Sequence, residues 1–157
     1  MIKQNQEIRD QQTIEEILSK SEICRIAMID DGKPYLLPFN YGYKDNCIYI
    51  HSAPAGKKID ILRKNNHVCF EIEYKAEVVK HTDPCKWATL YRSVIGYGDI
   101  QIITDTKEKK TGLDIIMAHN GKTGENIYQE KQVDAMVILK LSIKTVTGKQ
   151  SSNWDRY

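Results

Sequence analysis

Alternating hydrophobic and polar residues run through most of this chain and predict a protein built mainly from β-strands. The clearest case is HVCFEIEY at 67–74, where hydrophobic side chains recur at every second position. Other runs of β-branched and aromatic residues predict further strands. The predicted strands are 23–29, 35–43, 47–51, 67–74, 86–103 and 133–143. Turn-forming residues between them, such as Asp31-Gly32, are typical of hairpins in an antiparallel sheet.

Helical spacing of hydrophobic residues is confined to three shorter segments. Thr13, followed by Glu16, has the pattern of a capping box at the start of the first helix. The other predicted helices cover 57–65 and 106–119. Polar segments predict an N-terminal arm, two loops and a C-terminal tail, at 1–12, 75–85, 120–132 and 144–157 respectively. Six or more strands in hairpins, with few helices, favour an antiparallel barrel with helices at its rim.

Two of the predicted strands contain residues that disturb a regular ladder. Pro38 lacks a backbone N–H, so it predicts an edge strand, a bulge or an interrupted ladder. Unpaired backbone groups at such a place could bind a ligand. Gly96 and Gly98 predict a kink or a bulge in the strand 86–103.

Composition adds bounds on the class of protein. With 157 residues, of which 41% are hydrophobic and 28% charged, we expect one globular domain covering 1–157. The net charge of +2 is too small to indicate a nucleic-acid partner. No apolar run is long enough to span a membrane, and the polar N-terminus does not resemble a signal peptide. A cytoplasmic location is therefore the default expectation.

The cysteines and histidines do not predict a metal site. Cys24, Cys47 and Cys69 lie in predicted strands and Cys85 in a polar loop, so free thiols are expected instead of a zinc site or a disulfide. The four histidines have no metal-ligand spacing. The phosphate-binding motifs GxGxxG after a strand and GxxxxGK[ST], and the nucleophile motif GxSxG, are absent.

The segment CIYIHSAPAGKKIDIL at 47–62 contains the strongest candidate for a binding site. A strand is followed by a turn of small residues and by a helix that begins with Lys57 and Lys58. A helix N-terminus offers unpaired N–H groups and partial positive charge, so these lysines, with Ser52 and His51, could hold a phosphate. A solvated turn with two surface lysines explains the same pattern.

Tyrosine is the commonest aromatic residue, with nine Tyr against two Trp and two Phe. Tyrosines on the strands could line a pocket for a planar ring, or could simply fill the core and rim of the barrel. Tyrosines of this kind occur at 35, 41, 43 and 49. A planar heteroaromatic phosphate, such as flavin mononucleotide (FMN), would use both the basic turn and these rings.

Several segments together resemble a known family. They are PYLLPFNYGY, IYIHSAPAGKKIDIL, HVCFEI, YRSVIGYGDI and VILKLSIKTVTGK. In this combination the chain resembles the flavin split-barrel family that contains pyridoxamine 5′-phosphate oxidase, and within it the Nim-type 5-nitroimidazole-resistance proteins. The resemblance implies a mainly β fold with flanking helices, a six-stranded antiparallel split β-barrel. It also implies a homodimer with FMN at its interface.

The same resemblance implies roles for individual residues. Lys57 and Lys58 would bind the phosphate, and His51 would be the catalytic residue near the flavin ring. Tyr91 and Ser93 would approach the cofactor from their own chain or from the partner chain. Trp154 with Arg156 resembles an aromatic-plus-arginine tail of the oxidase branch. The implied cofactor-binding residues are Pro38, Phe39, Asn40, Tyr41, His51, Ser52, Ala53, Lys57, Lys58, Tyr91, Ser93 and Trp154.

Three functions follow as alternatives. The first is an FMN-dependent oxidoreductase that reduces small electrophiles such as nitroimidazoles, with His51 as proton donor. The second is a non-enzymatic flavin- or haem-binding protein for storage or sensing, which the lack of an acid–base pair beyond His51 keeps open. The third is a structural or interaction domain that has lost its ligand. Oxidation of vitamin B6 is disfavoured, because the pyridoxal-phosphate contacts of the oxidase are not recognisable.

Overall fold

The computed structural model describes residues 6–152 and 154. The strands that it describes are β1 (Glu7–Ile8), β2 (Ile23–Asp30), β3 (Lys33–Asn40), β4 (Gly42–Lys44), β5 (Cys47–Ser52), β6 (His67–Val79), β7 (Ala88–Ile103) and β8 (Val137–Gln150). The helices are α1 (Gln11–Lys20), α2 (Lys57–Lys64), α3 (Thr106–His119) and α4 (Glu130–Asp134), with a 3₁₀ turn at Pro84–Lys86.

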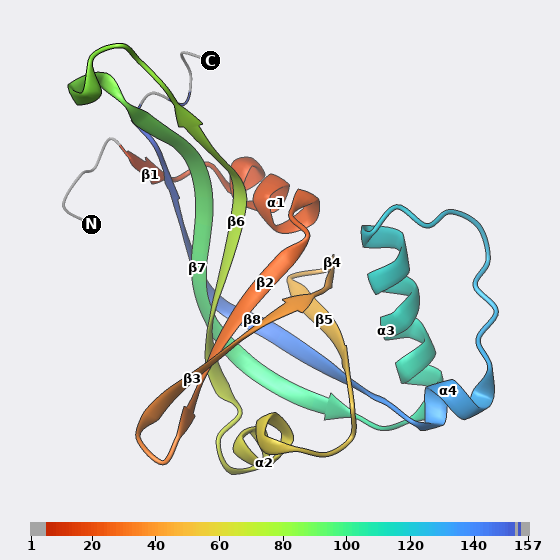
Figure 1. Cartoon of the computed structure of the whole chain (residues 1–157). Helices are drawn as coiled ribbons and strands as arrows, with labels where there is room; N and C mark the ends of the chain where they lie inside the picture. The colour runs from red at the N-terminus through yellow and green to blue at the C-terminus, as the bar shows by residue number, and fades with distance from the viewer. Residues whose placement is uncertain (1–5, 153, 155–157) are drawn as a thin grey trace.

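The strands form one antiparallel sheet that curls around a core without closing. Its order is β3-β2-β6-β7-β8-β5-β4, and β1 pairs with β8 off this path. Only Tyr41 separates β3 from β4, so the two ends of the open sheet are joined by the chain itself. Figure 1 shows β3 and β5 diverging from β4, with α2 beneath them. This arrangement confirms the predicted mainly β fold class with flanking helices.

Hydrophobic side chains on the concave side of the sheet make the main core. Alternate residues of each strand point inward, as in β6, where Val68, Phe70 and Ile72 are buried. Helices α1 and α2 cover the openings of the barrel with hydrophobic faces. The residues that they bury are Ile14, Ile17, Leu18, Ile59, Ile61 and Leu62.

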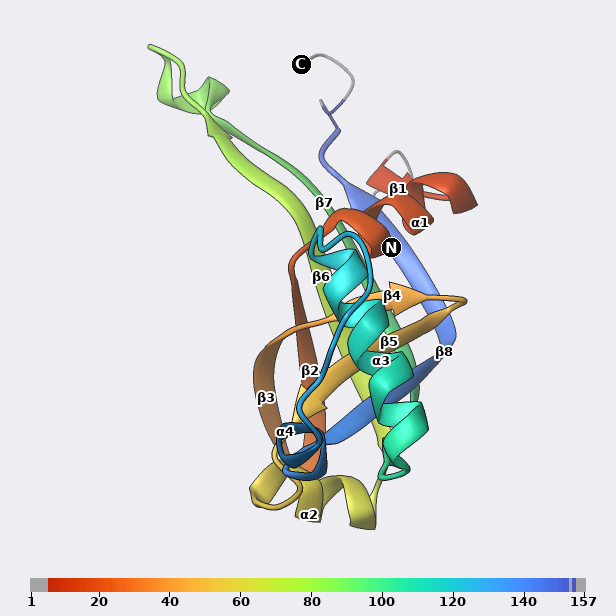
Figure 2. The same cartoon turned by 90° about the vertical axis from the view of Figure 1, so that its right-hand side faces the viewer.

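A second hydrophobic cluster lies on the convex side, under α3. Leu113 and Ile116 of α3 pack there with Ile138 of β8 and Val133 of α4. Gly112 permits this close packing, because a Cβ at that position would lie 2.9 Å from Cγ2 of Ile138. Figure 2 shows α3 lying along the outside of β5 and β8.

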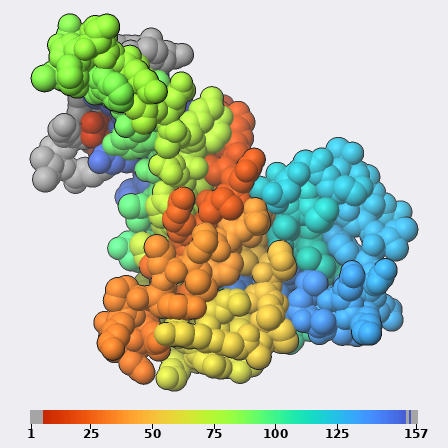
Figure 3. Space-filling view, in the orientation of Figure 1, coloured from red at the N-terminus to blue at the C-terminus, as the bar shows by residue number. Residues whose placement is uncertain are grey.

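The far halves of β6 and β7 extend beyond the rest of the molecule as a two-stranded hairpin. Figures 1 and 2 show this hairpin projecting past α1, and Figure 3 shows its atoms standing clear of the barrel. A register shift between Tyr74 and Ala76 marks the point where the projection begins. Val78 and Trp87 on this hairpin are 55% and 51% exposed.

The structure corrects the predicted start of the first helix. The N-cap is Asp10, not Thr13, because a carboxylate oxygen of Asp10 accepts hydrogen bonds from both the backbone N–H and the hydroxyl of Thr13, at 2.8 and 2.7 Å. The segment 1–12 is also more than an arm, since β1 and the first residues of α1 lie within it. Residues 1–5 lie outside the described residues.

Other element boundaries also differ from the prediction. The predicted strand 35–43 is two strands, β3 and β4, divided at Tyr41. The polar segment 75–85 begins with the last five residues of β6, and the loop 120–132 contains the start of α4. The segment 133–143 begins in α4, and β8 continues through most of the predicted tail to Gln150. Most residues of β8 after Ile143 are exposed or half-buried, so hydrophobicity alone does not reveal this part of the strand.

The predicted irregularities are present. β3 pairs only with β2 among the described strands, so Pro38 lies in an edge strand. The pairing of β7 with β8 shifts register between Tyr97 and Gly98, which confirms a bulge near the two glycines. All four cysteines are free, and Cys24 is buried. In the described part of the chain no group of His, Cys, Asp and Glu could hold a metal ion, and no helix is long and apolar enough to cross a membrane.

Candidate functional site

The outer edge of β3 carries backbone groups without a strand partner. The turn between β2 and β3 has Asp31 and Gly32 at its centre with φ of 48° and 80°, which is the type I′ geometry of a two-residue hairpin. In such a hairpin the flanking pair, Asp30 and Lys33, exchanges two hydrogen bonds, and bonded and non-bonded pairs alternate along the strands. Residues of β3 at non-bonded positions therefore direct both backbone groups away from β2.

Pro38 and Asn40 occupy non-bonded positions, opposite Arg25 and Ile23 of β2. The missing N–H of Pro38 thus costs no bond to β2, which explains why the strand tolerates proline here. The carbonyl of Pro38 and the N–H of Asn40 remain at the free edge, where a ligand with a polar rim could bond to them. The side chain of Asn40 points elsewhere, since its Nδ2 lies 3.5 Å from the carbonyl oxygen of Glu22.

The side chain of Tyr41 belongs to the core. It is fully buried, and its hydroxyl donates a hydrogen bond of 2.7 Å to the carbonyl of Leu18 at the end of α1. Burial raises the pKa of this phenol well above its usual range. The Tyr41 carbonyl accepts from Nδ2 of Asn120 at 3.0 Å. Phe39 is half-buried and packs against the core from the inner side of β3.

The second part of the candidate site is the end of β5 and the loop that follows it. His51 is exposed, whereas Ser52 is 5% exposed and its hydroxyl donates to the carbonyl of Ala53 at 3.0 Å. β5 pairs with β4 only through Cys47–Tyr49, so the backbone of residues 50–52 also has a free edge among the described strands. The two free edges, on β3 and β5, lie on either side of the opening in the sheet (Figure 1).

Helix α2 begins at the foot of this opening. Gly56 is its N-cap residue and has φ of 107°, a value that favours glycine, and its carbonyl accepts from the N–H groups of Ile59 and Asp60. The N–H groups of Lys57 and Lys58 have no partner within the helix, as in any first turn. Space around Gly56 is open, because a Cβ there would have no neighbour within 4 Å.

The two lysines at the start of α2 have different surroundings. Nζ of Lys57 lies 2.9 Å from a carboxylate oxygen of Asp30 and 4.7 Å from the centre of the Tyr35 ring. The hydrogen bond to Asp30 raises the pKa of Lys57. Lys58 is half-buried and has no ion pair with any described residue. The sequence does not reveal Asp30 or the place of Tyr35 beside Lys57, since no spacing rule relates the turn after β2 to α2.

The remaining predicted residues, Tyr91, Ser93 and Trp154, lie away from the start of α2. Ser93 is opposite Glu73 on β6, whereas His67, two positions beyond the Asn65 cap of α2, is opposite Asp99. Ser93 and Asp99 are six positions apart on β7, which corresponds to about 20 Å. Tyr91 lies further still along β7. Within one chain these residues are therefore far from Lys57 and Lys58.

Trp154, in the C-terminal segment, lies beside the first part of β7, which contains Tyr91. Its ring stacks on the guanidinium group of Arg92, with Cζ 4.4 Å from the ring centre. Arg92 also donates to Oε1 of Gln150 at 3.0 Å. Trp154 therefore covers the base of the projecting hairpin. Arg156, the other residue of the predicted tail pair, lies outside the described residues.

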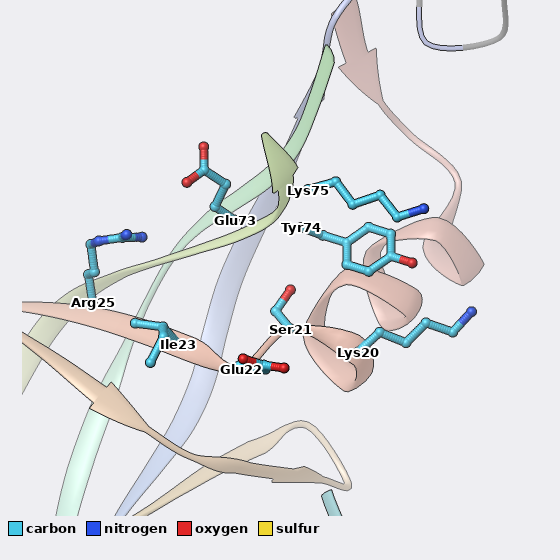
Figure 4. Close-up of a pocket in the computed structure, with 8 residues that line it drawn as sticks. All are labelled: Lys20, Ser21, Glu22, Ile23, Arg25, Glu73, Tyr74 and Lys75. Carbon is cyan, nitrogen blue, oxygen red and sulfur yellow. The ribbon is translucent and has the colours of Figure 1, made fainter. Parts of the chain in front are cut away.

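A hollow of about 350 Å³ on the convex face separates the two groups of residues (Figure 4). It lies between the end of α1, the start of β2 and the middle of β6. Its lining residues are Lys20, Ser21, Glu22, Ile23, Arg25, Glu73, Tyr74 and Lys75. Ile23 is opposite Asn40, and Glu73 is opposite Ser93, so the hollow lies between the predicted ring-binding strand and β7.

Beside this hollow the convex face of the sheet exposes large hydrophobic side chains. Leu36, Ile29, Ile95 and Tyr97 are 57%, 50%, 49% and 49% exposed. Leu36 and Tyr97 belong to one row across the sheet, because Ala27 pairs with Leu36 and with Cys69, and Cys69 pairs with Tyr97. We call these four residues the apolar face.

Comparison with known proteins agrees with this architecture. The sequence matches the family model for pyridoxamine 5′-phosphate oxidase over residues 10–150. The chain belongs to this family. It is also similar to an uncharacterized protein of Rhizobium meliloti strain 1021, with 34% identity over 56 residues. That alignment covers 36% of each of the two chains, so it spans about a third of the curated relative.

Solved structures extend the comparison. A candidate 5-nitroimidazole antibiotic resistance protein from Bacteroides thetaiotaomicron is 32% identical, with a TM-score of 0.82 over 92% of this chain and 86% of its own. The flavocytochrome Anf3 from Azotobacter vinelandii is 20% identical, with a TM-score of 0.77 over 92% of this chain and 69% of its own. The FAD- and haem-binding protein of Mycobacterium smegmatis is 19% identical, with a TM-score of 0.82 over 95% and 75%. The last two share the fold.

Proposed function

We propose that this protein is an FMN-dependent oxidoreductase that reduces small electrophiles, nitroimidazoles among them. The observation that carries the proposal is the basic start of α2, placed beside the free edges of β3 and β5 in a chain of this family. The similarity to the Bacteroides resistance protein supports nitroimidazoles as the class of substrate.

The donors at the start of α2 suit a phosphate monoester. Two backbone N–H groups, the helix dipole and the ammonium groups of Lys57 and Lys58 all favour an anion. Gly56 adds no side chain that would keep a phosphate from these N–H groups. Ser52 could contribute its hydroxyl after turning away from the Ala53 carbonyl.

The free edge of β3 suits the polar rim of a flavin ring. An isoalloxazine has neighbouring N–H and carbonyl groups, and the β3 edge offers an alternating carbonyl and N–H at Pro38 and Asn40. Because Pro38 gives no N–H, it restricts which part of the rim can bond there. The backbone would thus hold the ring in register, and the Tyr41 side chain would support β3 from the core.

We also propose that two copies of the chain complete each site. The apolar face is exposed on one chain, and contact with a second copy would cover it. Tyr91 and Ser93 lie on the same convex side of β7 as Ile95 and Tyr97, so they would meet the partner too. This arrangement supports a role for residues that lie too far along β7 to reach the phosphate site of their own chain.

In this proposal the flavin, once reduced, supplies electrons as hydride or singly, and the protein binds and orients the reactants. His51, exposed at the end of β5, could donate a proton to an oxygen of the nitro group as it is reduced. The positive charge at the start of α2 would neutralise the phosphate charge and so fix the position of the ring.

A second candidate function is binding of flavin or haem without catalysis. It is favoured by the exposed position of His51, which has no hydrogen bond to another titratable side chain in the described part of the chain. Related folds include a flavocytochrome and a FAD- and haem-binding protein.

One experiment distinguishes these functions. The purified protein is titrated with FMN and with haemin, and the FMN complex is reduced anaerobically and mixed with a nitroimidazole. The oxidoreductase proposal predicts tight FMN binding and reoxidation faster than that of free reduced FMN. Tight binding with reoxidation at the rate of free flavin would favour the binding protein, and failure to bind FMN would reject both flavin functions.

A further inference from the structure

We propose that Lys57 and Lys58 do not share one task, and that Lys58 alone holds the cofactor phosphate while Lys57 fastens the β2–β3 hairpin to α2. This inference rests on the proposed FMN site. It makes Lys57 a positioning residue and Lys58 the residue that selects a phosphorylated flavin.

The contacts of Lys57 point toward the hairpin. Its Nζ lies 2.9 Å from Asp30, the last residue of β2, and 4.7 Å from the centre of the Tyr35 ring on β3. These contacts join α2 to both strands of the hairpin. A second ion pair, between Lys64 of α2 and Asp31 of the turn, is longer, at 3.8 Å. Helix α2 is thus attached to the β2–β3 turn at both of its ends.

Asp30 makes Lys57 a poor ligand for phosphate. If Nζ of Lys57 turned to an anion at the start of α2, it would give up a charge-assisted hydrogen bond and a ring contact. The Asp30 carboxylate would then remain unpaired near a second negative group, and the two would repel each other. The free energy of moving Lys57 therefore works against phosphate binding.

Lys58 has no such competitor. In an α-helix residues three and four positions apart lie on one face, so Lys58 shares its face with the buried residues Ile61 and Leu62. This position explains why Lys58 is half-buried although it lies in the first turn. Side chains lean toward the N-terminus of a helix, which directs Lys58 toward the free N–H groups at Gly56–Lys58. No carboxylate among the described residues forms an ion pair with it.

The division of roles also bears on β3. Because Tyr35 and Pro38 belong to the same strand, the contact from Lys57 holds the strand whose free edge would meet the flavin ring. Loss of Lys57 should therefore disturb ring binding and leave the phosphate preference intact. Loss of Lys58 should remove the phosphate preference and leave ring binding intact.

The test compares FMN with riboflavin, which has the same ring and no phosphate. Dissociation constants of both flavins are measured for wild type, Lys57→Ala, Lys58→Ala and Asp30→Asn. The matched control is Lys64→Ala, which removes the other lysine that joins α2 to the hairpin. The ratio of the riboflavin constant to the FMN constant isolates the phosphate contribution.

We expect Lys58→Ala to lower this ratio at least about tenfold and to leave riboflavin binding within about twofold. Lys57→Ala should weaken both flavins alike and keep the ratio within about threefold. Asp30→Asn should weaken riboflavin binding in the same way but should not lower the ratio, because it releases Lys57 and removes a negative charge near the phosphate. Lys64→Ala should leave the ratio unchanged. A loss of the ratio in Lys57→Ala equal to that in Lys58→Ala would overturn the inference, whereas a wild-type protein that binds neither flavin would overturn the proposed function itself.

Discussion

Ile95→Lys should separate the two copies that the proposed site needs. Ile95 lies at the centre of the convex face of β7 and is 49% exposed in a single chain. Glu71 of β6, which pairs with Arg25 at 2.9 Å, is directly opposite it, and position 95 is half exposed, so a lysine there should leave the monomer folded. The substitution therefore tests contact between copies and not the stability of the barrel.

The magnitude follows from the exposed half of the side chain. Complete burial of an isoleucine contributes about 2–3 kcal/mol, so covering its exposed half contributes about 1 kcal/mol per copy and about 2 kcal/mol per dimer. This loss corresponds to about a 30-fold rise in the dissociation constant. Burying two ammonium groups adds a further desolvation cost, so 30-fold is a lower bound.

Sedimentation equilibrium over a range of protein concentrations measures the dissociation constant directly. Ile127→Lys is the matched control, because Ile127 is also an exposed isoleucine, 94% exposed, but lies in the loop between α3 and α4. We expect Ile95→Lys to be monomeric where wild type and Ile127→Lys are dimeric, with the circular dichroism of all three alike. Wild-type association in Ile95→Lys would refute the assignment of this face.

Further predictions concern the site and the core. His51→Ala should keep FMN affinity within about threefold and slow reoxidation of the reduced complex by a nitroimidazole at least about tenfold in stopped-flow measurements. Tyr41→Phe should lower the free energy of unfolding by about 1–2 kcal/mol in urea titrations, because the buried carbonyl of Leu18 loses its donor. Lys109→Met should lower it by about 2–3 kcal/mol, since the buried ammonium group donates to the carbonyls of Val133 and Met136 at 2.6 and 3.1 Å. The hydrogen bonds from Thr13 lower the pKa of Asp10, so its contribution to stability is complete above the ordinary aspartate pKa and is lost as pH falls through the lowered value; Asp10→Asn should remove this part of the acid dependence of unfolding.

The strand pattern and the resemblance together predicted most of the fold, and the reasons are local. The alternation of hydrophobic and polar residues in β6 and the proline in β3 are local signals, and both can be recognised in the sequence itself. The predicted strand ends at residue 143, whereas β8 continues to Gln150, because the last residues of β8, KTVTGKQ, are mostly polar. They form a strand because β7 supplies backbone partners along residues 145–150 and β1 adds partners at Gly148 and Lys149, and both strands come from distant parts of the chain.

The first helix shows how a local signal can mislead. Asp10 and Thr13 are both favourable N-cap residues, and the pair Thr13–Glu16 fits the capping-box pattern. In the structure the Asp10 carboxylate takes two hydrogen bonds from Thr13, so the helix starts one turn earlier. The choice between two adequate N-cap residues depends on where β1 ends, and the capping-box pattern carries no information about that.

At the candidate site, sequence identified the residue types and the structure adds their neighbours. Lys57 and Lys58 are equivalent in sequence, yet only Lys57 meets Asp30 and Tyr35. The separation of Tyr91, Ser93 and Trp154 from α2 likewise follows only from the register of β6 and β7. These facts turn a single predicted set of cofactor residues into two groups, which would belong to different copies of the chain in each site.

The most direct test of the account is sedimentation velocity of the purified protein with FMN, followed by both protein and flavin absorbance. If two copies share each site, flavin absorbance should move with a species of twice the chain mass of 18.1 kDa, at one FMN per chain, and should disappear from that position in Ile95→Lys. Flavin that sediments with single chains, or that stays with Ile95→Lys monomers at wild-type affinity, would contradict a cofactor site shared between two copies.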